Sequence, residues 1–420
     1  YVFRICLLPS SIAVASQQRV GARINSVIRV LDEATLAEIS LLPACHDQPI
    51  TDLQVIPGSQ GQGLVSCSRD GTAKLWDLRS SGGQPVVTIA ASNNKKDAQI
   101  FGASVNADNA LAVGVDSEVL LYDINSGKKG PYFTYTDVHM DIVNCVKFHP
   151  TRTNLCMTGG EDTLINVLDV TDLHNEDDGQ APKVTISAED SVRSVCAAGP
   201  AGDLLVASTC TEKLQVWNAG TAQRCLETSG IREHPLLRAV GSTEEDVQLG
   251  YIIDVQYDAA NNRLYVVGGS TNGNVVCCEL LDTATLATHG VFHTGLGDEG
   301  HEGVVRSAVL DTTRGSVFTG GEDGAVVRWG PNAEESNELK DAHCPKESSW
   351  CRSVFALLTF LPVSIVTSSG YQRVFCFQEE VKKVERADSI LSGAGTPSTV
   401  GDLTPGFRGR LDSSDPFWGL

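Results

Sequence analysis

The sequence is poor in several residue types that would point to particular classes of protein. Of its 420 residues only 2 are Met, aromatic residues make up 6%, and Lys and Arg number 32 against 52 Asp and Glu. The formal net charge is −20 at pH 7, so direct nucleic-acid binding through a basic face is not expected. The acidity either keeps the surface soluble or attracts basic protein segments.

Paired cysteine motifs are also missing. The 13 Cys include no C-x-x-C pair, and the chain has no N-x-[ST] acceptor. We therefore expect reduced core thiols, no metal, no cofactor, and an intracellular location in cytoplasm or nucleus. The first residues are apolar but are interrupted by Arg4 and Pro9, so no membrane span is expected there. Because the chain begins with Tyr, we expect the natural amino terminus to lie upstream.

What the sequence does contain is a repeat. Seven apolar stretches end in the same way at intervals of about 45 to 60 residues, and turns rich in Gly, Asp and Asn precede them. The stretches are SVIRVLD, TAKLWD, EVLLYD, LINVLD, KLQVWN, NVVCCE and AVVRWG. One small sheet cannot bury both of its faces, so such sheets stack in closed rings. The pattern predicts an all-β, seven-bladed propeller of four-stranded antiparallel blades, with eight blades as an alternative.

The pattern also predicts how the chain is divided. We expect the propeller to cover 1–345, and a strand-like extension at 346–386 to close or dock on it. The remaining 387–420 is rich in Gly, Ser, Pro and Thr, which predicts a flexible tail. A long spacing marks an insertion at 229–250, which we interpret as a partner-facing loop.

Four polar and aromatic residues recur at matching positions in several repeats. Two sets are complete and a third has Leu168 in place of Trp: His46, Ser66, Asp70 and Trp76; His301, Thr319, Asp323 and Trp329; His139, Thr158 and Asp162. These residues resemble those of the WD-repeat family of β-propellers. The resemblance implies that each set forms a hydrogen-bonded chain from Trp through Ser or Thr and His to Asp, which holds the strands of a blade together.

Within that family, the order of degenerate and well-formed repeats is most similar to the group of WD repeat-containing protein 89. The resemblance covers about 40–331. It is carried by DIVNCVKFHPTRTNLCMTGGEDTLINVLD, GYIIDVQYDAANNRLYVVGGSTNGNV and HEGVVRSAVLDTTRGSVFTGGEDGAVVRWGP.

The same residue types could suggest a catalytic Ser-His-Asp triad. However, the trio recurs around the ring, whereas an enzyme needs one set, so we interpret the residues as structural and predict that the protein is not an enzyme. The acidic run that starts at Asp172 lacks the spacing of a calcium loop. His343 and Cys344 have no second pair nearby.

The resemblance implies partner-binding residues at one mouth of the ring. They follow the apolar start of each innermost strand: Thr51, Phe101, Asn144, Arg193, Ile253 and Arg306. Arg193 and Arg306 could clamp a carboxylate, and Phe101 and Ile253 could supply apolar anchors, unless loops cover them.

The segment from Leu64 to Arg79 also matches the Trp-Asp-x-Arg box of substrate receptors of cullin-4 ubiquitin ligases, which implies an adaptor contact at Asp77 and Arg79. The leading prediction is a non-catalytic, monomeric scaffold for protein-protein interactions in a multiprotein complex. The alternatives are such a ligase receptor or a structural subunit of a nuclear or ribosome-assembly particle.

Overall fold

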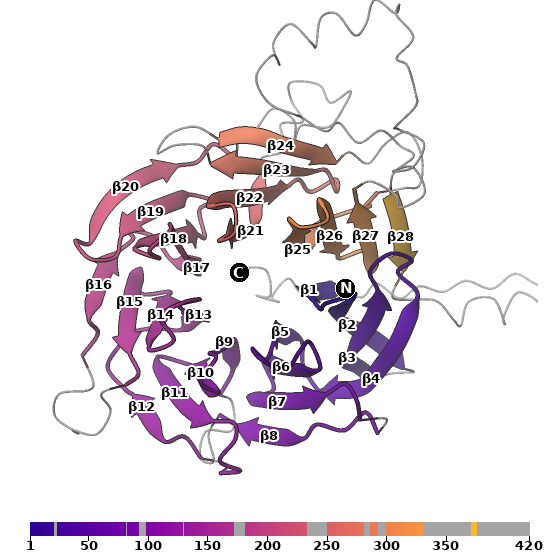
Figure 1. Ribbon diagram of the computed structural model, residues 1–420, viewed down its shortest axis with the longest axis horizontal. Helices are drawn as coiled ribbons and strands as arrows, with labels where there is room; N and C mark the ends of the chain where they lie inside the picture. The colour runs from indigo at the N-terminus through magenta and orange to yellow at the C-terminus, as the bar shows by residue number, and fades with distance from the viewer. Residues whose placement is uncertain are drawn as a thin grey trace, which may run out of the picture. The chain divides into compact units, whose positions relative to one another are not determined.

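The computed structural model describes residues 1–20, 23–80, 82–91, 98–128, 130–171, 181–232, 250–280, 286–292, 300–330 and 371–375. These residues form seven antiparallel sheets of four strands each. Within Tyr1–Phe377 the sheets are arranged in a ring (Figure 1). The molecule is a seven-bladed β-propeller, which confirms the predicted fold class, and the described residues hold no eighth sheet. They also contain no helix long and apolar enough to cross a membrane.

We number the sheets as blades 1 to 7 in chain order, and each blade runs from its innermost to its outermost strand. Blade 1 comprises β1 (Val2–Leu7), β2 (Ser11–Val20), β3 (Arg23–Asp32) and β4 (Glu38–His46). Blade 2 comprises β5 (Ile50–Val55), β6 (Gly63–Ser68), β7 (Thr72–Asp77) and β8 (Val87–Ala90). Blade 3 comprises β9 (Ile100–Val105), β10 (Ala110–Val115), β11 (Glu118–Asp123) and β12 (Phe133–Tyr135).

The other four blades repeat this order. Blade 4 comprises β13 (Val143–Phe148), β14 (Leu155–Gly160), β15 (Leu164–Asp169) and β16 (Val184–Ser187). Blade 5 comprises β17 (Val192–Ala198), β18 (Leu204–Thr209), β19 (Leu214–Asn218) and β20 (Gln223–Thr228). Blade 6 comprises β21 (Tyr251–Asp258), β22 (Arg263–Gly269), β23 (Val275–Leu280) and β24 (Leu286–Phe292). Blade 7 comprises β25 (Val305–Asp311), β26 (Ser316–Gly321), β27 (Ala325–Trp329) and β28 (Tyr371–Phe375).

The third strand of every blade carries one of the seven repeated stretches recognised in the sequence. Its side chains are buried on both faces over most of its length, as in β15, where the four central residues are buried and only the two end residues are partly exposed. Such a strand reads as a continuous apolar run because neighbouring blades cover both of its faces. This explains why the third strands gave the clearest repeat.

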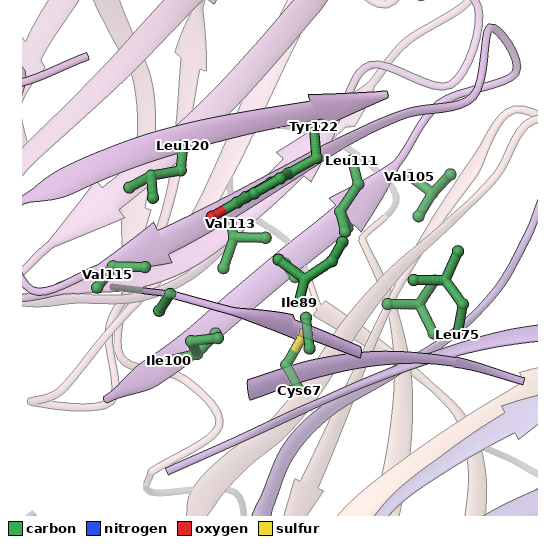
Figure 2. Close-up of a cluster of buried hydrophobic side chains, with 14 of the residues drawn as sticks. Cys67, Leu75, Ile89, Ile100, Val105, Leu111, Val113, Val115, Leu120 and Tyr122 are labelled. Carbon is green, nitrogen blue, oxygen red and sulfur yellow. The ribbon is translucent and has the colours of Figure 1, made fainter. Parts of the chain in front are cut away.

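The core is divided among the interfaces between blades. Seven clusters of buried apolar side chains lie one at each of the seven contacts between neighbouring blades. Figure 2 shows the cluster between blades 2 and 3, where Cys67, Leu75 and Ile89 meet Leu111 and Tyr122. Burial of apolar area is the main favourable term in folding, so each blade depends on both of its neighbours.

Where the ring closes, the described strands of blades 7 and 1 belong to separate sheets. β1 packs beside β25, where the Ile5 N–H donates to Ser307 Oγ at 3.0 Å. Arg314 donates to the Pro9 carbonyl at 3.0 Å and to Glu33 Oε2 at 2.7 Å. A buried cluster that includes Val2 and Phe318 fills the contact.

The predicted division of the chain stays a prediction. β28 pairs with β27 and supplies the outermost strand of blade 7, and it is the described part of the expected extension at 346–386. The expected tail at 387–420, the run from Asp172, His343 and Cys344 lie outside the described residues, as does most of the insertion at 229–250.

Candidate functional site

The innermost strands share one irregularity. In each blade one residue near the start of the innermost strand is skipped in the pairing with the second strand, which is the signature of a β-bulge; it is the second residue of the strand in six blades and the third, Ile253, in blade 6. We call the face at which the innermost strands begin the upper face, and the opposite face the lower face. The seven bulged residues form what we call the upper mouth: Phe3, Thr51, Phe101, Asn144, Arg193, Ile253 and Arg306.

Six of these residues are the partner-binding residues expected from the sequence, and the structure brings them to equivalent positions. Phe3 is the seventh, and sequence reasoning missed it because the resemblance that implied the other six covers only about 40–331. The available signal was the apolar Val2 directly before it, which matches the apolar residue before every other bulge. A bulge re-aims a side chain relative to the regular strand, so a bulge repeated seven times makes a defined ring of side chains.

Some upper-mouth side chains brace the ring. Three of them donate to the carbonyl of the residue that directly precedes the bulge in the innermost strand of the next blade. The bonds are Thr51 Oγ1 to Ile100 O at 2.7 Å, Asn144 Nδ2 to Val192 O at 3.0 Å, and Arg193 Nη2 to Ile252 O at 2.7 Å. These side chains therefore contribute to the contact between blades as well as to the surface.

The two arginines of the upper mouth already bind carboxylates of this chain. Arg193 forms a bidentate pair with Glu212, at 2.9 and 2.8 Å. Arg306 Nε donates to Glu322 Oε1 at 2.7 Å. A clamp on a partner's carboxylate, as the sequence suggested, would first have to release these glutamates, so the internal pairs compete with that role.

The apolar members of the upper mouth have no ion pair to release before a partner binds. Phe3, Phe101 and Ile253 are each partly exposed. The Arg69 guanidinium lies 5.3 Å from the Phe101 ring centroid, in cation–π contact, and the rings of Tyr1 and Phe3 are 6.3 Å apart. The upper mouth thus offers aromatic and aliphatic surface beside stacked or paired charges, a composition typical of interface hot spots.

The recurrent His-containing sets are largely buried, and the His of each set comes from the segment just before the blade, His46 being the last residue of β4 in blade 1. In blade 2 the Trp76 indole N–H donates to Ser66 Oγ at 2.9 Å, and Ser66 Oγ is 2.7 Å from His46 Nε2. His46 Nδ1 is 2.9 Å from Asp70 Oδ2. Because Trp can only donate and an ionised Asp can only accept, the protons run from Trp76 through Ser66 and His46 to Asp70.

Two other blades carry the same arrangement. In blade 7 Trp329 Nε1 donates to Thr319 Oγ1 at 2.7 Å, which lies 2.8 Å from His301 Nε2, and His301 Nδ1 lies 3.1 Å from Asp323. In blade 4 the contacts are His139 to Thr158 at 2.8 Å and His139 to Asp162 at 3.0 Å, with Leu168 buried where Trp would stand.

The Asp carboxylate at the end of each hydrogen-bonded series of side chains connects two backbone segments. Asp70 accepts the N–H of Asp47 at 3.2 Å from the loop before blade 2, and the N–H of Thr72 at 2.9 Å from the turn inside it. Burial raises the pKa of Asp70, but hydrogen bonds from His46 and Thr72 outweigh burial and bring the pKa to about 2. The carboxylate therefore stays charged and holds both loops.

The hydroxyl groups of these sets do not face a substrate. Ser66, Thr158 and Thr319 are each 0% exposed. Each hydroxyl is already bonded to a His, and in blades 2 and 7 also to a Trp. A nucleophile must be reachable, so this geometry fits a structural role for the three sets.

The Trp-Asp-x-Arg segment lies on the lower face, in the turn after β7. Arg79 is 74% exposed on its side chain, and its Nε and Nη2 donate to the two Asp77 carboxylate oxygens at 2.9 and 2.8 Å. Three large apolar side chains are also exposed where the outermost strands of blades 1, 2 and 3 begin: Ile39, Val86 and Tyr132. This second surface is on the opposite side of the ring from the upper mouth.

Comparison with known proteins gives a consistent result. The family model "WD domain, G-beta repeat" matches 39–77 and 131–169, the stretches that run from the last strand of one blade through the third strand of the next. The chain is 28% identical over 345 residues to the WD repeat-containing protein 89 homolog of Dictyostelium discoideum, covering 81% of this chain and 85% of that protein. It is 30% identical over 284 residues to the WD repeat-containing protein GTS1 of Arabidopsis thaliana, covering 66% and 68%.

A chain in the crystal structure of a mitotic checkpoint complex has a similar fold. The TM-score is 0.55 at 15% sequence identity, and the match covers 74% of this chain and 81% of that one. At this level of identity the likeness concerns the fold alone.

Proposed function

Because the chain belongs to the WD-repeat family, whose propellers are of the protein-interaction scaffold type, we propose that it is a non-catalytic platform in a multiprotein complex and binds a protein segment at the upper mouth. The observation that carries the proposal is the bulge at the equivalent position in all seven innermost strands. A rigid ring presents these side chains in a preformed arrangement, so the scaffold loses little conformational entropy on binding.

Affinity purification with mass spectrometry tests this proposal. Wild type is compared with Phe101→Ala, which removes an apolar anchor and the ring under Arg69, and with Arg79→Ala on the lower face. These two changes are preferred to Arg193→Ala, which would also remove a brace between blades. Partners lost only with Phe101→Ala support the upper mouth. If both variants retain every partner, the proposal fails.

A second function is favoured by one observation, the exposure of Arg79 on the same face of the ring as three exposed apolar side chains. It is the role of a substrate receptor of a cullin-4 ubiquitin ligase, in which Asp77 and Arg79 would contact the adaptor. Recovery of the adaptor with wild type, and its loss with Arg79→Ala alone, would move this function ahead of the first.

The third function, a subunit of a nuclear or ribosome-assembly particle, rests on the net charge of −20. Acidic surfaces meeting basic chains predict association that weakens as salt increases. Equal recovery of partners at low and high salt would count against it. An intracellular location remains part of the proposal.

A further inference from the structure

Two of the seven innermost strands carry the same Asp-x-Gln motif. In β5 it is Asp52 and Gln54, and in β21 it is Asp254 and Gln256. Each carboxylate accepts the next backbone N–H, at 2.9 Å in β5 and 2.8 Å in β21, and the Gln amide, at 3.0 and 3.1 Å. Each Gln also donates to a carbonyl of the next blade. The two motifs are therefore built alike.

The two carboxylates differ in their cation. Lys147 Nζ lies 3.1 Å from Asp52 Oδ2, although Lys147 belongs to blade 4 and Asp52 to blade 2. The lysine reaches past blade 3, whose innermost strand carries Gly102 and Ser104 at the corresponding positions and comes so close to β13 that a Cβ on Gly102 would lie 2.8 Å from the Val146 nitrogen. The pair thus spans three blades near the ring axis.

For Asp254 the described residues supply no such partner. Lys147 is the fifth residue of an innermost strand two blades after Asp52; the fifth residue two blades after Asp254, across the closure of the ring, is Cys6 in β1. Cys6 carries no positive charge and its side chain is several atoms shorter than that of lysine. No described lysine, arginine or histidine forms an ion pair with Asp254, and its side chain remains partly exposed.

One cation does lie in the neighbourhood. Arg4, the third residue of β1, is exposed, and its Nη1 donates to the Phe3 carbonyl at 3.2 Å rather than to Asp254. Burial raises the pKa of Asp254, and hydrogen bonds from Gln256 and Val255, together with the charges of Arg4 and Lys147, do not cancel that effect. The carboxylate of Asp254 is thus less well compensated than that of Asp52, whose pKa is lowered.

We infer that Asp254 accepts a lysine or arginine side chain from the protein segment bound at the upper mouth, in the place that Lys147 takes beside Asp52. The inference rests on the proposed function. Asp254 follows Ile253 of the upper mouth, one strand step of about 3.4 Å farther from the upper face, a distance that a long cationic side chain spans easily. The net charge of −20 attracts such a segment.

Random short peptides displayed on phage and selected on the full chain are the probe. The selected peptides are then synthesised and their affinity is measured by fluorescence anisotropy. The variants are Asp254→Asn, the matched control Asp108→Asn in an exposed lower-face turn, and Phe101→Ala in the upper mouth. In parallel, the basic residue of each peptide is replaced by neutral norleucine, which tests the same contact on the wild-type protein even if Asp254→Asn does not fold.

The expected result is a shared lysine or arginine in peptides that lose binding with Phe101→Ala. Both Asp254→Asn and the norleucine peptide then weaken binding about tenfold or more, because a charge-assisted hydrogen bond is lost, while Asp108→Asn changes nothing. Peptides that need Phe101 but tolerate norleucine and Asp254→Asn overturn this inference and leave the proposed function standing. Peptides that ignore Phe101, or the recovery of none, overturn both.

Discussion

Blades 2 and 3 are neighbours with the same strand order, but their interiors are built differently. Blade 2 has the polar chain from Trp76 to Asp70. In blade 3 Tyr122 takes the place of Trp76, and Val113 takes the place of Ser66 in the pairing register. The Tyr122 hydroxyl is buried and has no hydrogen-bond partner among the described residues.

The comparison shows that a blade does not need the polar chain in order to form. Blade 3 is held by apolar packing on both faces, including the cluster that it shares with blade 2 (Figure 2). Blade 5 offers a third solution, in which Trp217 donates to Gln215 at 3.2 Å and Gln215 donates to the Ala188 carbonyl. The polar chain is therefore one way of satisfying buried groups and anchoring loops, and the fold comes from the repeated apolar strands.

The largest effect on the difference between blades 2 and 3 is expected from removing the Ser66 hydroxyl, which is bonded to both Trp76 and His46. Ser66→Ala leaves the Trp76 N–H and His46 Nε2 buried without their partner, so we expect a loss of about 3 kcal/mol in the free energy of unfolding. Urea unfolding followed by fluorescence measures it. A loss below about 1 kcal/mol would show that water or a shift of neighbouring side chains replaces the lost hydrogen bonds. The polar side chains of blade 2 would then add little stability compared with the apolar packing of blade 3.

The second test concerns the point at which the two blades meet. Gly71 has φ +73°, and an added Cβ would lie 2.4 Å from the Ala98 carbonyl oxygen. Gly127, in blade 3, has φ +67° with open space around it. We expect Gly71→Ala to cost about 2 kcal/mol and Gly127→Ala about 1 kcal/mol, because only the first adds a clash to the backbone strain. Equal costs for the two variants would show that the contact at Ala98 yields freely.

A smaller, pH-dependent difference in stability between the two blades follows from Asp70, at the end of the hydrogen-bonded side chains of blade 2. The pKa of Asp70 falls to about 2 in the folded protein, below its usual 3.8, so its contribution to stability is present above the usual value and is lost as pH falls through about 2. Asp323 in blade 7 behaves in the same way. Denaturant midpoints measured against pH should fall less steeply in this range for Asp70→Asn/Asp323→Asn than for wild type. If the midpoints of wild type and variant fall in parallel with pH, the lowered pKa values of Asp70 and Asp323 are contradicted.

The smallest effect is expected in blade 3. Tyr122→Phe removes a buried hydroxyl that has no described partner and whose pKa burial raises to about 12. The free energy of unfolding should stay the same or rise by about 1 kcal/mol. A clear loss of stability would mean that the hydroxyl has a partner, and that blade 3 has a polar chain of its own.

The ring of seven sheets could be predicted because its signal is local. The third strands repeat as apolar runs, and the turns before them repeat Asp, Asn and Gly, so the count of blades needed no long-range information. Six of the seven upper-mouth positions were predicted from the resemblance to WD-repeat propellers, because each follows the apolar start of an innermost strand. Phe3 was missed because it lies before the stretch, about 40–331, that carries the resemblance.

The charges of the site could not be predicted in this way. Arg193 and Arg306 looked free in the sequence, whereas Glu212 and Glu322 bind them in the folded chain. The pair of Lys147 with Asp52 joins residues 95 positions apart, and it depends on small side chains in the blade between them. An ion pair between blades, such as Lys147 with Asp52, depends on which residues of different blades face one another near the ring axis. The spacing of residues within one repeat does not reveal this.

The contact between blades 7 and 1 that closes the ring has a consequence for the order in which the protein folds and for how it opens under force. The bond from Ile5 to Ser307 joins positions 302 residues apart, and in the described part of the chain no sheet combines strands from both blades. Bringing such distant segments together costs more conformational entropy than forming any other contact between neighbouring blades. We therefore expect the interface between blades 7 and 1 to form last. Under a pulling force applied through the amino terminus, blade 1 should peel away first and open the ring into an arc.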